Sequence, residues 1–266
     1  MQKMIFTLVL LTHLATSVVA QDWVRERLNN SPRHHEWVTI EHDGRQVEAF
    51  LAFPETEDKA LAVVVIHQNR GLGDWVRGVA DQLAEAGYLA IAPDLLSGMG
   101  PDGGKTSDFL DSDAARSAIY DLDADQVTAD LRAVANYISG LPAANGKLVV
   151  VGFCWGGSQT FRFATNHTGL SAAFPFYGTA PTDERALARI QSPVYGFYGG
   201  NDARVNATLP LTTEQMEDAG KSYDPVIYDG ARHGFMSAGE APDADDANRK
   251  AREDAWVRLK GLLATL

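Results

Sequence analysis

The spacing of hydrophobic positions changes along the chain. Short runs with the spacing of a β-strand are followed by longer runs with the spacing of an α-helix. Residues 37–42 and 46–53 alternate with a period of two around Asp43-Gly44, which predicts a β-hairpin closed by a tight turn. Residues 61–66 form a continuous, largely β-branched run, which is typical of a strand buried on both faces. The first half of the chain therefore opens with strands rather than with a helical bundle.

The rest of the chain alternates between the two periods. Helical patterns cover residues 75–86, 123–139, the segment after Cys154, 209–220 and 243–263. Strand patterns cover residues 88–92, 148–153, 172–177, 194–198 and 224–228. Residues 97–112 are rich in Gly, Asp and Ser, so we expect a loop there. Strands that alternate with helices predict an α/β fold with a mainly parallel central sheet and helices on both faces.

The first 20 residues have a different pattern. Lys3 precedes an apolar run from Met4 to Leu14, and Val18-Val19-Ala20 stands before polar Gln21-Asp22. This is the pattern of a secretory signal peptide, and the run is too short to span a bilayer comfortably. We therefore expect residues 1–20 to be removed, the mature chain to be periplasmic or secreted, and no stable membrane insertion afterwards. The alternative interpretation is an N-terminal amphipathic anchor.

Charge narrows the choice of partner. The 266 residues carry a formal net charge of −12, from 23 basic and 35 acidic side chains. Loss of residues 1–20 removes Lys3 and no acid, which leaves 22 − 35 = −13. Because so acidic a surface repels phosphate backbones and anionic membranes, we expect no nucleic-acid partner. A small-molecule partner remains, and the oligomeric state is open.

The strand at 148–153 runs into the only cysteine of the chain. The segment Gly152-Phe-Cys154-Trp-Gly156-Gly157 fits a nucleophile elbow, with Cys in place of the usual Ser. Glycines on both sides let the following helix approach the strand closely. The turn places Cys154 at a helix N-terminus, which favours a thiolate. The competing interpretation is a buried structural thiol.

An imidazole and a carboxylate follow in the order that such a nucleophile requires. Asp202 comes after the strand at 194–198, and His233 comes after the last strand. His233 is the candidate base and Asp202 the group that orients it, although Asp202 also suits a simple turn residue. An oxyanion hole would take backbone N–H groups from Trp155 and from the loop after the strand at 61–66, with Asn69 as the candidate.

Five motifs in this order resemble one family. They are His67-Gln-Asn-Arg-Gly-Leu72, Gly87-Tyr-Leu-Ala-Ile-Ala-Pro-Asp-Leu95, Gly152-Phe-Cys-Trp-Gly-Gly157, Tyr198-Gly-Gly-Asn-Asp202 and His233-Gly-Phe235. The chain resembles the dienelactone hydrolase family of α/β-hydrolases from about residue 36 to the C-terminus. The resemblance implies an α/β-hydrolase domain over residues 21–266. It also implies a Cys154–His233–Asp202 triad that cleaves an ester or lactone through an acyl-thioester.

The chain departs from the family pattern at the substrate side of the site. Gln68 stands where the family commonly has a Glu that helps to ionise the thiol. Gln cannot accept that proton, so we expect Gln68 to orient the thiol by a hydrogen bond. Gly98 and Ser237 align with two arginines that hold the carboxylate of dienelactone in the family.

Two further side chains are candidates for substrate contacts. Arg70 either clamps an anionic substrate or pins its own loop, and Phe235 either lines the pocket or fills the core. The histidines have no metal-ligand spacing with the lone cysteine, so we expect neither a metal nor another cofactor. The alternative functions are a catalytically impaired small-molecule binding protein on a hydrolase scaffold and thiol redox chemistry without a resolving cysteine.

Overall fold

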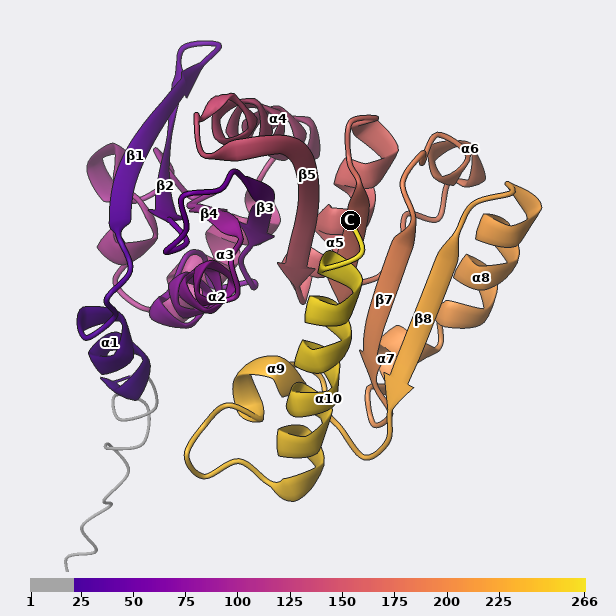
Figure 1. Cartoon of the computed structure of the whole chain (residues 1–266). Helices are drawn as coiled ribbons and strands as arrows, with labels where there is room; N and C mark the ends of the chain where they lie inside the picture. Colours follow the sequence, from indigo (N-terminus) through magenta and orange to yellow (C-terminus); the bar gives the residue numbers. More distant parts are fainter. Residues whose placement is uncertain (1–21) are drawn as a thin grey trace, which may run out of the picture.

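The computed structural model describes residues 22–266, so the predicted signal peptide lies outside the described residues (Figure 1). The strands are β1 (His35–His42), β2 (Arg45–Ala52), β3 (Ala60–Ile66), β4 (Leu89–Pro93), β5 (Ala144–Phe153), β6 (Ala172–Phe176), β7 (Val194–Gly199) and β8 (Tyr223–Tyr228). The longer helices are α1 (Asp22–Asn29), α2 (Asp74–Glu85), α3 (Ser112–Asp121), α4 (Ala124–Gly140), α5 (Trp155–Asn166), α8 (Leu209–Asp218) and α10 (Asp246–Leu263). Four-residue helices are α6 (Glu184–Leu187), α7 (Ala203–Asn206) and α9 (Phe235–Ala238).

The strands form a single eight-stranded sheet in the order β1-β2-β4-β3-β5-β6-β7-β8. β2 pairs antiparallel with β1 and β4, and the other pairs are parallel. The predicted mainly parallel sheet and its N-terminal hairpin are therefore confirmed. Figure 1 shows the arrowheads of β5, β7 and β8 pointing to the same edge. Residues that follow these strands consequently meet at that edge.

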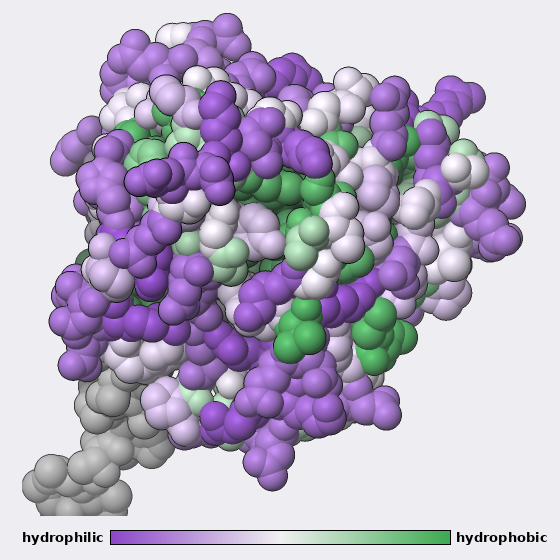
Figure 2. Space-filling model, in the orientation of Figure 1, coloured by the Kyte–Doolittle hydropathy of each residue, from purple (hydrophilic) through white to green (hydrophobic). Residues whose placement is uncertain are grey.

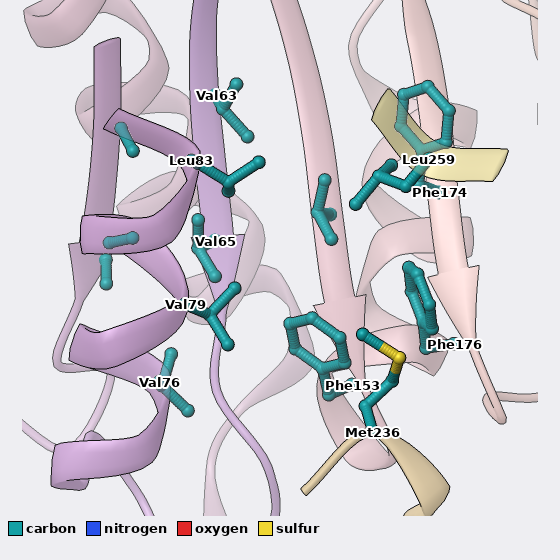
Figure 3. Packing of buried hydrophobic residues seen from close by; sticks show 14 of the residues in the cluster. Val63, Val65, Val76, Val79, Leu83, Phe153, Phe174, Phe176, Met236 and Leu259 are labelled. Atoms are coloured by element: carbon teal, nitrogen blue, oxygen red, sulfur yellow. The ribbon is translucent and has the colours of Figure 1, made fainter. Parts of the chain in front are cut away.

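Two hydrophobic clusters cover the two faces of the sheet. On one face α1, α2, α9 and α10 pack against the strands, and on the other α4, α5 and α8 do. Figure 3 shows Val76, Val79 and Leu83 of α2 directed toward Val63 and Val65 of β3. Every residue of β3 is buried, as its continuous apolar run predicts. The helices on both faces therefore hold the strand ends in fixed positions.

Two of the longer helices, α3 and α1, escaped the sequence pattern. Residues 97–112 contain two 3₁₀ turns, η1 (Pro101–Gly103) and η2 (Thr106–Asp108), and α3 begins at Ser112. α3 buries Ala115 and Ile119, which is too narrow an apolar stripe to predict a helix from periodicity. Its start is instead signalled by Asp111, whose carboxylate accepts hydrogen bonds from the amides of Asp113 and Ala114. α1 was missed next to the N-terminal leader pattern.

A buried carboxylate ties the N-terminal segment to α2. The side chain of Asp81 has no exposed surface and accepts hydrogen bonds from Arg33, Ser31 and His35. Arg33 binds it through two nitrogens, each at 2.7 Å. Burial by itself would raise the pKa of Asp81, but the hydrogen bonds from Arg33, Ser31 and His35 outweigh it and lower that pKa. The chain before β1 is thus fastened to the helix layer.

The outer surface is largely polar on the face shown in Figure 2, with hydrophobic residues concentrated in its central part. Among residues 22–266, no helix combines the length and apolar character needed to cross a bilayer.

Replacing Asp81 with Ala should lower the free energy of unfolding by about 3 kcal/mol, because the poorly exposed guanidinium of Arg33 then keeps only the exposed carboxylate of Glu85, 3.8 Å away, as a counter-charge. Urea unfolding at pH 7 measures this difference. The lowered pKa means that the carboxylate stabilises the fold above its unfolded pKa of about 3.9 and loses this contribution as the pH falls through the folded value. The difference in the free energy of unfolding between the variant and the parent protein should therefore become smaller at acidic pH.

The matched control is Asp224→Ala, since Asp224 pairs with Arg258 while more than half of its side chain is exposed. We expect a much smaller loss there. Equal losses in the two variants would contradict the assigned role of Asp81.

Candidate active site

The site begins at a strained turn between β5 and α5. Cys154 has φ 58° and ψ −116°, a conformation that a non-glycine residue rarely adopts. Two glycines make the turn possible. A Cβ on Gly152 would lie 2.2 Å from the carbonyl oxygen of Gly156, and one on Gly156 would lie 2.4 Å from the carbonyl oxygen of His67. The predicted elbow geometry is therefore present, and it lifts a half-exposed thiol above the strand end.

The three residues predicted as a triad lie in one hydrogen-bonded line. His233 Nε2 lies 3.0 Å from Cys154 Sγ, and His233 Nδ1 lies 2.5 Å from Asp202 Oδ2. The Asp202 side chain is 6% exposed and also caps α7, with Oδ1 accepting from the amide of Val205. Residues from the ends of β5, β7 and β8 thus converge on one sulfur atom.

The charges and hydrogen bonds of Cys154, His233 and Asp202 favour a negative thiolate beside a positive imidazolium. Burial of Cys154 by itself would raise its pKa, but the hydrogen bond and charge of His233, helped by the Trp155 amide and the charge of Arg204, lower it overall. Burial of His233 by itself would lower its pKa, but its hydrogen bonds to Cys154 and Asp202 raise it overall. The opposite shifts stabilise a thiolate–imidazolium pair, which titrates as a unit.

The loop after β3 lies beside the nucleophile. Ile66 of β3 is in register with Gly152 of β5, so residues 68 and 69 continue alongside Cys154 and the start of α5. The buried ring of His67 stacks on the indole of Trp155, with centroids 5.5 Å apart. Asn69 is half-buried, and its side-chain amide donates to the hydroxyl of Tyr120, 3.2 Å away. The two residues expected to supply oxyanion N–H groups therefore belong to segments that flank the thiol.

Gln68 does not have the predicted partner. Its Nε2 donates to Ser237 Oγ at 3.4 Å, whereas the side chain that hydrogen-bonds to Cys154 Sγ among the described residues is His233. Ser237 Oγ itself donates to the carbonyl of Gly234, so its lone pairs are free to accept from the amide. The expectation that Gln68 orients the thiol is consequently wrong for this conformation.

The two predicted substrate contacts have different outcomes. Phe235 has no exposed surface and packs between the rings of Tyr177 and Tyr228, so it fills the core and does not line a pocket. Of the two alternatives for Phe235, the interpretation as a core residue is therefore correct and the substrate contact is wrong, because α9 packs inward against α10. Arg70 is exposed on the loop after β3, and no side chain of the described residues pins it there.

Tyr177 is a neighbour of the site that the sequence analysis missed. It follows β6 with φ 40°, and its ring meets the His233 ring edge to face at a centroid distance of 5.0 Å. Burial raises the pKa of its hydroxyl well above the ordinary value, and the hydroxyl has no hydrogen-bond partner within the described part of the chain. Its place directly after a parallel strand was the signal that could have identified it.

The described residues contain no group of three or more His, Cys, Asp or Glu side chains arranged to hold a metal ion. The groups brought together at the site are a thiol with a lowered pKa, an imidazole and backbone N–H groups. Such a set is suited to acyl transfer.

Comparison with known proteins gives a consistent result. The model of the dienelactone hydrolase family matches residues 47–266. A Salmonella typhimurium protein named as a carboxymethylenebutenolidase is 32% identical over 233 residues, covering 83% of each chain. One of the same name from Saccharolobus solfataricus is 28% identical over 263 residues, covering 85% of this chain and 96% of its own.

Solved structures agree with the sequence relatives. A dienelactone hydrolase from Klebsiella pneumoniae superposes with a TM-score of 0.76 at 25% identity, over 88% of this chain and 99% of that one. A dienelactone hydrolase-like promiscuous phosphotriesterase from metagenomic libraries has the same fold, with a TM-score of 0.75 at 23% identity over 88% and 98% of the two chains. The predicted α/β-hydrolase fold is thereby confirmed.

Replacing His233 with Ala should raise the pKa of the Cys154 thiol, because the hydrogen bond and positive charge that stabilise the thiolate are lost. The rate of alkylation by iodoacetamide, followed against pH, measures the thiolate. In the parent protein the reactive form should persist to lower pH than in an ordinary thiol, while in the variant the profile should move toward that of an ordinary thiol, with a pKa of about 8.5.

His167→Ala is the control, since this half-buried histidine stacks on Phe163 and has no contact with the thiol. Its profile should match that of the parent. Superimposable profiles for the parent and the His233 variant would refute the ion pair.

Proposed function

Since the chain belongs to the dienelactone hydrolase family and is thus a hydrolase of ester or lactone bonds, we propose that it cleaves its substrate with Cys154 as the nucleophile. The observation that carries the proposal is the continuous line from Asp202 through His233 to the Cys154 sulfur. The family relatives named as carboxymethylenebutenolidases support a small ester or lactone as substrate.

The reaction follows from the positions of these groups. The Cys154 thiolate attacks the carbonyl carbon and forms a C–S bond, while the carbonyl π electrons move to oxygen. Backbone N–H groups of Trp155 and Asn69 stabilise that oxyanion. When the intermediate collapses, the C–O bond to the leaving alkoxide breaks and the proton on His233 Nε2 passes to that oxygen. An acyl-thioester remains on Cys154.

Water completes the cycle. Neutral His233 removes a proton from water as the oxygen attacks the thioester, and the thiolate leaves with the C–S electrons while the imidazole keeps the proton. Asp202 holds the ring through Nδ1 and stabilises its charged form in both half-reactions. In a lactone the leaving oxygen stays attached to the acyl group, so a single hydroxy acid is released.

The chain's departures from its family affect substrate choice. Gly98 and Ser237 carry no charge at the two positions aligned with carboxylate-binding arginines. A positive charge acts on the thiol from Arg204 instead, and Arg70 is exposed on the loop that carries Asn69. The substrate class is accordingly a small ester or lactone that does not depend on the family's paired arginines.

Replacing Cys154 with Ala should abolish hydrolysis of small aryl esters, with a loss of at least about a thousandfold, because no other nucleophile of the described site is joined to His233. Mass spectrometry of the parent protein mixed with an ester and lactone panel should show an added acyl mass on Cys154. A protein that binds the esters but never acquires that mass would be the impaired binding protein instead.

Export is the second part of the proposal, and the leader pattern of residues 1–20 supports it. Expression of the full chain in a bacterial host followed by N-terminal sequencing should find a mature chain that begins near Gln21 and is recovered outside the cytoplasm. Recovery of the uncleaved chain in the cytoplasm would contradict export.

A further inference from the structure

We infer that Thr106, held by buried Asp94, is a positioning residue that sets the conformation of the loop carrying Asn69. The inference rests on the proposed function, because it concerns how the oxyanion-binding loop is held. The loop comprises residues 68–72, between β3 and α2.

Asp94 is the fixed point of the arrangement. It follows β4 and is 1% exposed, and its carboxylate accepts three hydrogen bonds. One comes from the amide of Leu96 at 3.1 Å, and two come from Thr106, the amide at 3.0 Å and the hydroxyl at 2.6 Å. A buried carboxylate with three donors holds Thr106 in one position.

Thr106 in turn contacts the loop and fixes the position of its C-terminal end. Because its hydroxyl has given its only hydrogen to Asp94, the same oxygen accepts the amide of Leu72, at 3.1 Å. Gly71 has φ 79°, and a Cβ on it would lie 2.1 Å from Thr106 Oγ1. The C-terminal end of the loop therefore rests directly on the threonine.

The N-terminal end of the loop is tied to the same segment. His67 is fully buried, its Nε2 accepts the amide of Leu95 at 3.3 Å, and its Nδ1–H therefore donates to the carbonyl of Gln68 at 2.8 Å. Both ends of the loop are thus fastened to the chain that follows β4. Asn69 lies between them.

This arrangement separates two requirements of the proposed reaction. The Cys154 thiolate is positioned by the end of β5 and stabilised by His233. The position of the Asn69 amide, in contrast, depends on the loop. Misplacement of an oxyanion donor by about 1 Å costs on the order of a hundredfold in rate. Alkylation by iodoacetamide displaces iodide from a saturated carbon and builds no oxyanion, so it does not need the loop.

The test compares Thr106→Val with Thr106→Ser in the whole mature chain. We expect Thr106→Val to lower kcat for a small aryl ester by at least about tenfold, with alkylation of Cys154 and its pH profile within about twofold of the parent. Serine keeps the hydroxyl, so Thr106→Ser should remain within about threefold of the parent in both assays.

The matched control is Thr212→Val. Thr212 of α8 is also poorly exposed, and its hydroxyl donates to the carbonyl of Thr208, so it makes a similar bond without contacting Asp94 or the loop. It should leave both rates unchanged. Gly71→Ala is a second variant that changes the other side of the same contact, because its methyl group would overlap Thr106 Oγ1 and so disrupt the contact between the loop and the threonine. It should show the same selective loss.

Several results would overturn the inference. One is ester turnover at the parent rate in both Thr106→Val and Gly71→Ala. Another is a Thr106→Ser variant whose ester turnover is as low as that of Thr106→Val. A parallel fall of alkylation and turnover would indicate general loss of structure rather than positioning. If the parent protein itself forms no acyl group on Cys154, the proposed function fails first and the inference falls with it.

Discussion

The contact between Cys154 Sγ and His233 Nε2, 3.0 Å long, is the interaction on which the proposed chemistry of this protein depends. A half-buried thiol would normally be harder to ionise than a free one, and a half-buried imidazole harder to protonate. Each group removes the penalty of the other, because the charged forms attract across a short distance in a poorly solvated site. Asp202 extends the effect by holding the far nitrogen of the ring.

That contact exists because three parallel strands end at one edge of the sheet. β5, β7 and β8 are distant in sequence, and their register places the residues that follow them side by side. The turn at Cys154 adds a local constraint, a positive φ that the close approach of α5 to β3 maintains. Helices packed on both faces keep this edge rigid, so the geometry does not depend on a flexible loop.

The site divides into two parts with different supports. The thiol and imidazole are held by strand ends and by the buried Asp202 carboxylate, whereas the predicted oxyanion loop is held by the segment after β4 through Asp94 and Thr106. In the proposed reaction these are two separately supported elements, one for ionising the nucleophile and one for receiving the developing charge.

The sequence alone determined the strands, the long helices other than α1 and α3, the mainly parallel sheet and the convergence of Cys154, Asp202 and His233 after three strands. These follow from the period of the hydrophobic pattern and from local glycine and turn chemistry, which act within a few residues. Only the tertiary structure decided that Phe235 is buried, that Gln68 bonds to Ser237, that Tyr177 packs edge-on against His233, and that α3 forms from a weak apolar stripe. Each of these depends on contacts between segments far apart in the chain, and no local pattern encodes which side chain such a contact will meet.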